Sequence, residues 1–257
     1  MNAFPIQPAL QSAPGSADCA VIELRQYTLH PGARETLIEL FDREFIETQE
    51  AVGAAVIGQF RDLDRPDYFV WLRGFSDMHA RRQALTAFYG GPVWKAHRDV
   101  ANATMIDSDD VLLLRPAWPG AGFDTGSRPR PTVGSDKACE ELVIARIYSF
   151  GAPVDAALVE WFRQEAVPFF EELGATTAAV LVTEKVPNDF AALPVREGED
   201  VLAWFASFDD HAAYARFFAA VTQSRRWNEQ LQPVLQKRLR GKPPLLRLAP
   251  TARSLLR

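Results

Sequence analysis

The chain has little cysteine, no long apolar run and no excess of basic residues, and each shortage excludes a class of protein. Its two cysteines, Cys19 and Cys139, are too few for the disulfide framework of a small secreted domain and lack the spacing of metal ligands. No run approaches the ~18 consecutive apolar residues that cross a membrane. The net charge of -5 argues against nucleic acid, which requires a clustered basic face. We therefore expect a cytoplasmic protein with reduced thiols, no metal, no membrane span and no nucleic-acid partner.

Sequence motifs for catalysis are missing as well. The chain contains no nucleophile elbow, no glycine-rich phosphate loop and no dinucleotide-binding fingerprint. We therefore assign no catalytic residue and expect no cofactor.

What is present is the composition of an ordinary globular protein, with 47% hydrophobic and 24% charged residues. A chain of 257 residues buries enough surface to fold without a disulfide or a metal. Residues 1–19 lack the basic and apolar segments of a signal peptide, so we expect a disordered arm there. Arginine-rich stretches such as Arg81-Arg82 lie in helical patterns and are interpreted as solvated helix faces.

The strongest signal is an internal repeat. The hydrophobic periodicity of each half predicts the order strand, helix, strand, strand, helix, strand. Four residues recur 133 positions later: Trp71, Phe75, Asp77 and Trp94 correspond to Trp204, Phe208, Asp210 and Trp227. Arg25 and Tyr27 recur 121 positions later as Arg146 and Tyr148, because the loop over 184–200 is longer than its counterpart. The predicted units are residues 20–116 and 139–257, joined by a Pro- and Gly-rich linker over 117–138 that we expect to be mobile or extended along the surface.

The predicted order is that of the ferredoxin-like unit, which places both helices on one face of a four-stranded antiparallel sheet. The predicted strands are apolar on both faces, for example Ile22 and Leu24 against Val21 and Tyr27. A strand that is apolar on both sides is covered on both sides. The predicted fold class is therefore α+β, with two tandem ferredoxin-like units whose antiparallel sheets pack as an intramolecular dimeric α/β barrel. The alternative is two independent domains that pair with other chains.

The first half opens with the strand and turn ELRQYTLHPG over residues 23–32 and continues with WLRGF over 71–75, Arg81 and Trp94. In these segments residues 20–116 resemble the NIPSNAP family of the dimeric α/β-barrel superfamily. The resemblance implies the fold, and that superfamily includes cofactor-free oxygenases, isomerases, haem enzymes and proteins without established chemistry. Where the family commonly has a His-Leu-Trp run, this chain has Val70-Trp71-Leu72, so no role of that histidine is carried over.

Three polar residues in predicted strands are the first candidates for a ligand site. Arg25 and Tyr27 share one face of the first strand, and Arg73 lies in the third. An arginine buried in such a strand needs a partner, because an unpaired buried charge is strongly destabilising. The two arginines can bind a carboxylate or polarise a carbonyl, with Tyr27 as a hydrogen-bond donor. The alternative is a structural ion pair with Glu23 or another carboxylate.

Aromatic residues and one histidine complete the candidate set. Trp71, Tyr89 and Trp94 suit the wall of a pocket between sheet and helices, although both tryptophans recur in the second half, as core residues would. His97 is replaced by Gln230 in the second half, so the fold does not require it. It can serve as a general base or a haem ligand, and the alternative is a surface or packing role.

Three functions follow from these candidates. The first is a protein that binds a small apolar or acidic ligand or a protein partner, as one chain or as a homo-oligomer. The second is a cofactor-independent monooxygenase or isomerase that uses Arg25, Tyr27, Tyr89 and His97 around one cavity. The third is a haem-binding protein, which requires a histidine that faces a roomy apolar pocket.

Overall fold

The computed structural model describes residues 13–126, 128–135 and 139–257. The elements of the first repeat are β1 (Val21–Leu29), α1 (Arg34–Leu40), the π-helical turn η2 (Phe41–Phe45), α2 (Ile46–Glu50), β2 (Ala55–Asp62), β3 (Tyr68–Phe75), α3 (Met78–Gly90), α4 (Pro92–Thr104) and β4 (Met105–Pro116). Those of the second repeat are β5 (Leu142–Ser149), α5 (Ala156–Trp161), η3 (Phe162–Ala166), α6 (Val167–Glu172), β6 (Thr176–Thr183), β7 (Val201–Phe208), α7 (His211–Gln223), η4 (Trp227–Leu231), α8 (Gln232–Gln236) and β8 (Leu245–Pro250). The predicted order of elements is confirmed in both repeats. None of these helices combines the length and the apolar character that crossing a membrane requires.

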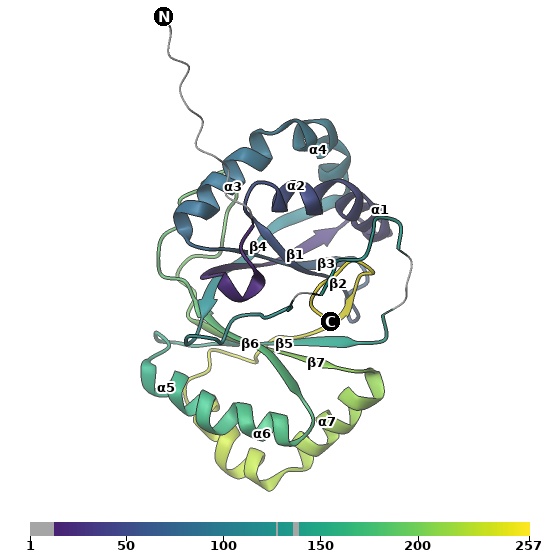
Figure 1. The fold of residues 1–257 in the computed structure, drawn as a ribbon. Helices are drawn as coiled ribbons and strands as arrows, with labels where there is room; N and C mark the ends of the chain where they lie inside the picture. Colours follow the sequence, from purple (N-terminus) through teal and green to yellow (C-terminus); the bar gives the residue numbers. More distant parts are fainter. Residues whose placement is uncertain (1–12, 127, 136–138) are drawn as a thin grey trace, which may run out of the picture.

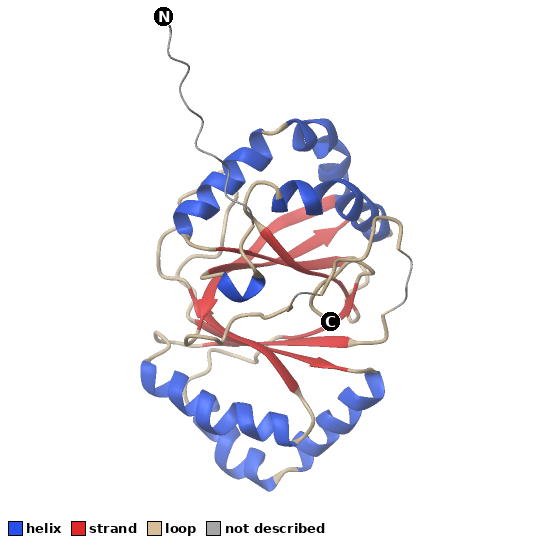
Figure 2. Cartoon of the chain, in the orientation of Figure 1, coloured by secondary structure: helices blue, strands red, loops and turns tan. Residues whose placement is uncertain are grey.

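Eight antiparallel strands form one closed barrel in the order β1-β3-β2-β8-β5-β7-β6-β4. Two seams join the repeats: β2 pairs with β8, and β4 pairs with β6. The helices of the first repeat cover one side of the barrel and those of the second repeat cover the opposite side (Figure 1). Figure 2 shows the strands as the layer between these two groups of helices. The predicted intramolecular barrel is therefore confirmed, and the alternative of two independent domains is wrong.

The strands are apolar on both faces because each face has a different neighbour. Ile22 and Leu24 point into the barrel, where they belong to one core with Leu181 and Phe205 of the second repeat. Tyr27, on the opposite face of β1, packs in a separate core beneath the helices of its own repeat. The barrel is thus filled by side chains from both repeats, and any site between sheet and helices belongs to one repeat.

The connection between the repeats is anchored inside the barrel. Phe123 is 0% exposed and lies against Phe205, with ring centroids 5.0 Å apart. The segment before β1 lies beside the connection. Cys19 is buried in the same core as Phe123, and Ser16 Oγ lies 2.8 Å from Thr125 Oγ1. The expectation of a mobile or surface linker is therefore wrong around Phe123, because this side chain is buried in the barrel core. Residues 1–12 of the expected arm, and 127 and 136–138 of the linker, lie outside the described residues.

Corresponding helices of the two repeats begin with a capping aspartate. Asp77 Oδ1 accepts a hydrogen bond from Ala80 N at 2.7 Å, and Asp210 Oδ1 accepts one from Ala213 N at 2.6 Å. Replacing Asp77 by alanine removes the acceptor at the start of α3, so we expect the free energy of unfolding in urea to fall by about 1 kcal/mol. Asp77→Ser keeps an acceptor and serves as the control. An equal loss in both variants would exclude capping as the cause.

Candidate functional site

A buried group of charged side chains lies between the sheet of the first repeat and α3. The Glu23 carboxylate is 0% exposed and contacts Arg25 Nη1 at 2.7 Å, Arg73 Nε at 2.8 Å and Arg81 Nε at 2.6 Å. Glu23 and Arg73 face each other across β1 and β3, and Arg81 reaches them from the first turn of α3. All three arginines are buried. These four residues are called the arginine cluster below. The cluster is buried and carries more positive than negative charge.

The charge of Glu23 is maintained by its neighbours. Burial by itself raises the pKa of a carboxyl group, but Arg73, Arg25 and Arg81 outweigh burial and hold the pKa of Glu23 well below its usual range. Ionised Glu23 therefore stabilises the fold at any pH above its ordinary value of 4.5, and that contribution decreases as the pH falls below this value.

This shift predicts the behaviour of Glu23 in acid. In a carboxyl ¹³C NMR titration of glutamate-labelled protein from pH 7 downwards, the Glu23 signal should stay at its ionised position until the protein unfolds. Exposed glutamates should titrate near their ordinary pKa of about 4.3 in the same spectra. An inflection of the Glu23 signal at that pH, in folded protein, would contradict the ion-pair geometry.

Two arginines of the cluster also hold polar residues beside it. Arg25 Nε donates to the Tyr27 hydroxyl at 3.0 Å, and Arg73 Nη1 donates to Gln49 Oε1 at 2.9 Å. Burial raises the pKa of Tyr27, and the Arg25 guanidinium offsets only part of this effect. Tyr27 therefore keeps its proton at neutral pH and can donate it, while its oxygen accepts from Arg25.

Hydrogen-bond donors outnumber acceptors at this site. Among the described residues, Trp71 Nε1 and Arg81 Nη2 are buried without a hydrogen-bond partner. Arg73 Nη2 lies 2.8 Å from the Glu23 carboxylate but lacks the alignment of a hydrogen bond, so that contact is electrostatic only. A buried donor without an acceptor costs about 1–3 kcal/mol. The arrangement therefore lacks an acceptor, and an anionic one suits the excess of positive charge.

A small apolar cavity adjoins the arginine cluster. Its volume is about 30 Å³, which is room for one or two water molecules. Its walls come from β1, β3 and the covering helices: Tyr27, Leu37, Phe41, Phe45, Gln49, Trp71, Phe88, Tyr89, Trp94, Ala101 and Met105. The guanidinium carbons of Arg73 and Arg25 lie 5.0 Å and 5.6 Å from the centre of the Trp71 ring, within the range of cation–π attraction. The cavity is thus apolar along its walls and positively charged beside Trp71.

The structure brings six of the seven candidate residues together. Four line the cavity, namely Tyr27, Trp71, Tyr89 and Trp94, and Arg25 and Arg73 lie over the Trp71 ring. His97 is not among the lining residues. Its side chain is 31% exposed, and its Nε2 lies 3.5 Å from Glu44 Oε2. The structure therefore does not bring His97 into the cavity, because its imidazole pairs with Glu44.

Sequence reasoning missed part of the site. Arg81, interpreted as part of a solvated helix face, is 0% exposed and bound to Glu23. The expected alternative for Arg25, an ion pair with Glu23, is confirmed, but Glu23 itself and Gln49 were not among the candidates. The signal that identifies Glu23, Arg73 and Arg81 is in the repeat, since the second copy has uncharged residues at all three positions.

The second repeat shows that the fold does not need Glu23, Arg73 and Arg81, whereas Arg25 recurs there as Arg146. The pair Glu23↔Arg73 between β1 and β3 corresponds to Ile144↔Ala206 between β5 and β7. Arg81, four residues after its capping aspartate, corresponds to Tyr214, which packs against Phe208 and Phe217. Apolar residues therefore fill the same positions in a sheet–helix interface of the same design. Replacing a buried ion network by apolar packing is often neutral or stabilising, so a sheet–helix interface of this design does not need these charges for stability.

Two larger hollows lie elsewhere. One, of about 320 Å³, lies between Gln26, Arg65, Asp110 and residues of β5 and β8, and the other, of about 250 Å³, lies within the 184–200 loop. Their polar side chains pair with each other, as in the bonds from Gln26 Nε2 to Asp110 and from Arg65 Nη2 to Gln26 Oε1. None of the unpartnered buried atoms found in the described residues belongs to either hollow. The arginine cluster and its cavity are therefore the stronger candidate.

Comparison with known families identifies the first repeat. Residues 22–118 match the family model described as NIPSNAP. The first repeat is a NIPSNAP domain. The match covers the arginine cluster and all residues that line the cavity, and it ends before the second repeat begins. No curated protein matches the chain.

Solved structures resemble the full barrel. A proposed monooxygenase from Fusobacterium nucleatum has a TM-score of 0.56 at 8% identity and covers 90% of this chain and 92% of its own. An anthrone oxidase-like protein has a TM-score of 0.55 at 13% identity, with 92% and 93% covered. A NIPSNAP-like domain protein from Burkholderia xenovorans matches 45% of this chain and 95% of its own at 24% identity, with a TM-score of 0.35. The first two structures support the fold of the two-repeat barrel. They do not show its chemistry.

Proposed function

We propose that the NIPSNAP domain binds a small molecule that combines an apolar, ring-sized body with one acidic group. The body occupies the cavity beneath the helices, and the acidic group accepts hydrogen bonds from the Tyr27 hydroxyl, Trp71 Nε1 and the arginine cluster. The observation that carries this proposal is the restriction of Glu23, Arg73 and Arg81 of the arginine cluster to one repeat. The second repeat has Ile144, Ala206 and Tyr214 at these three positions, so the fold tolerates their replacement. The first repeat keeps the charged residues at a place where unpaired hydrogen-bond donors adjoin an apolar cavity.

Ligand entry requires movement of the lining. A cavity of about 30 Å³ is too small for a benzene ring, so side chains of the lining have to move aside when a ring enters. Tyr89 is only half-buried, and its ring lies against Phe190 of the second repeat. Displacement at Tyr89 opens the cavity without separating the strands beneath it.

A pair of matched probes tests the proposal. We expect 4-fluorobenzoate to bind in ligand-observed ¹⁹F NMR, and 4-fluorobenzamide, which has the same ring and no charge, to bind at least about tenfold more weakly because a charge-assisted bond is lost. The benzoate signal should broaden with protein and recover on competition with unlabelled benzoate. Equal affinity of the two probes, or no binding of either, contradicts the proposed acidic-ligand site.

A second candidate function is oxygenation of the bound molecule without a cofactor. The likeness of the whole barrel to a proposed monooxygenase and to an anthrone oxidase-like protein motivates it. The site supports it through Arg25 and Tyr27, because a guanidinium group and a neutral hydroxyl can together stabilise an oxyanion that develops on a substrate. Dioxygen uptake on addition of anthrone, absent in a Tyr27→Phe variant, is the expected result, and no uptake above the protein-free rate excludes this activity for that substrate.

We also propose that the protein works in the cytoplasm and that its two thiols stay reduced there. Cys19 and Cys139 are unpaired, and burial raises the pKa of Cys19 to about 12 and that of Cys139 to about 11, which makes both poor nucleophiles. Association into a homo-oligomer stays a prediction, and sedimentation velocity of the purified chain tests it.

A further inference from the structure

The loop over residues 184–200 connects β6 to β7 of the second repeat but lies against the first. Its counterpart between β2 and β3 spans only residues 63–67. The loop follows the edge of β4 through two backbone hydrogen bonds, from Glu184 N to Leu113 O at 2.9 Å and from Arg196 N to Val111 O at 2.8 Å. The inserted residues of one repeat thus cover part of the other.

The tip of the loop binds the arginine cluster. Arg81 Nη1 donates to Asn188 Oδ1 at 3.0 Å and to Asp189 Oδ1 at 3.2 Å. Phe190, the next residue, lies against Tyr89 of the cavity lining, with ring centroids 6.2 Å apart. The loop therefore supplies a carboxylate to Arg81 of the cluster and an aromatic ring beside the cavity.

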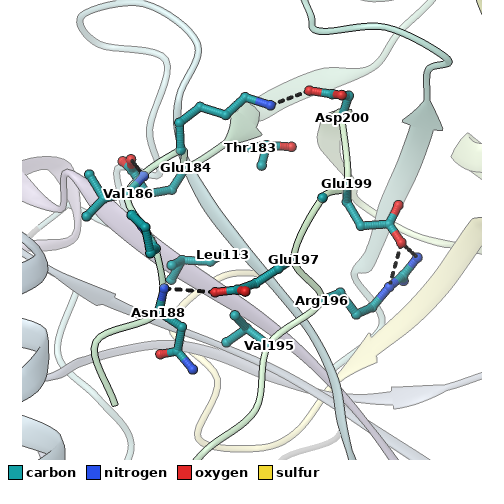
Figure 3. Close-up of a pocket in the computed structure, with 13 residues that line it drawn as sticks. Leu113, Thr183, Glu184, Val186, Asn188, Val195, Arg196, Glu197, Glu199 and Asp200 are labelled. Atoms are coloured by element: carbon teal, nitrogen blue, oxygen red, sulfur yellow. Dashed lines mark hydrogen bonds and ion pairs between the residues drawn. The ribbon is translucent and has the colours of Figure 1, made fainter. Parts of the chain in front are cut away.

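The rest of the loop is held by polar contacts, including the ion pair of Arg196 with Asp110 of β4 at 3.0 Å. Residues 184–188 and 195–200 of the loop line a hollow of about 250 Å³. The two segments are joined by a hydrogen bond in which Glu197 Oε1 accepts from Asn188 N at 3.0 Å (Figure 3). Arg196 pairs with Glu199 at 2.8 Å, and Lys185 pairs with Asp200, which are contacts of exposed or half-buried side chains (Figure 3). Phe190 and Leu193 at the tip pack against the apolar core of the first repeat, so the tip opens when these two partly buried side chains leave that core.

We propose that Asp189 competes with the acidic ligand of the NIPSNAP domain for binding to Arg81. Its carboxylate binds Arg81, and the ligand's acidic group takes its place when the loop tip moves away. Phe190 then leaves Tyr89, and the cavity opens. Because an uncharged molecule gains no ion pair with Arg81, the competition affects acidic ligands most. This inference rests on the proposed function of the same site.

Asp189→Ala tests the competitor role, with Glu199→Gln as the matched control. Both changes remove one loop carboxylate that pairs with arginine, but Glu199 pairs within its own loop. In Asp189→Ala we expect the affinity ratio of 4-fluorobenzoate to 4-fluorobenzamide to rise about fivefold, the equivalent of one partly exposed ion pair. Hydrogen–deuterium exchange of the amides over 188–193 should also accelerate. Glu199→Gln should change neither measurement.

The outcomes separate the inference from the function on which it rests. Binding of 4-fluorobenzoate by the natural protein with an unchanged or lower ratio in Asp189→Ala overturns the competitor role and leaves the proposed function intact. Failure of all three proteins to bind either probe overturns the proposed function and the competitor role with it. Unchanged amide exchange in Asp189→Ala overturns the part of the inference that concerns the tether of the loop tip.

Discussion

Replacing Glu23 by glutamine should lower the free energy of unfolding by about 3–5 kcal/mol, because it leaves buried guanidinium groups without their counter-charge. Arg25, Arg73 and Arg81 all contact this one carboxylate, and all are buried with it. Glutamine has nearly the same shape but carries no charge and has one acceptor oxygen in place of two, so its NH2 group faces an arginine donor and the neutralisation is lost. Urea denaturation followed by circular dichroism measures the effect.

Glu35→Gln is the control for this change. Glu35 also pairs with an arginine, Arg61, but its side chain is 53% exposed. Water screens such a pair, and its loss should cost less than about 1 kcal/mol. Similar losses in the two variants would show that the arginine cluster is hydrated in solution, and the charge argument for the site would then be untenable.

The second large effect is a separation of stability from binding. A variant that takes the residues of the second repeat at all three positions, Glu23→Ile, Arg73→Ala and Arg81→Tyr, should be more stable than Glu23→Gln, although it differs more from the natural chain. One buried cation then remains, Arg25, and it keeps its bond to Tyr27. The same variant should lose affinity for 4-fluorobenzoate by about 100-fold, the usual consequence of removing buried charged partners from a ligand's acid.

The two readouts of this triple variant check each other. A stable protein that no longer binds the probe assigns the arginine cluster to recognition. A protein as unstable as Glu23→Gln would instead assign the cluster to folding of the first repeat, and unchanged probe affinity would place the ligand elsewhere.

The barrel could be predicted from the sequence because its signals are local and occur twice. Strand and helix periodicities, the recurrence of Trp71 and Trp94, and apolar residues on both faces of the strands all agree with one architecture. Arg25 and Tyr27 could be selected for the same reason, since alternation along one strand places them on one face.

The partners of these residues could not be predicted in the same way. Arg81 is buried because it meets Glu23 and Asn188, and both are distant from it in the chain. A helical pattern identifies which residues share a face, but it does not reveal a carboxylate on a strand beneath that face. His97 illustrates the converse, because its absence from the second repeat suggested a function, whereas its imidazole pairs with Glu44. A difference between repeats is informative where an apolar residue replaces a charge in a buried strand, as at Glu23 and Ile144.

The seams between β2 and β8 and between β4 and β6 join two halves that one gene encodes side by side. In a symmetric pair of identical subunits, every substitution appears twice, so a longer loop or an extra charge must be tolerated on both sides at once. Here a change in one half leaves the other untouched. Evolution could therefore lengthen a loop on one copy and keep charged residues on its neighbour, a division of labour that two identical chains cannot reach by point mutation or insertion alone.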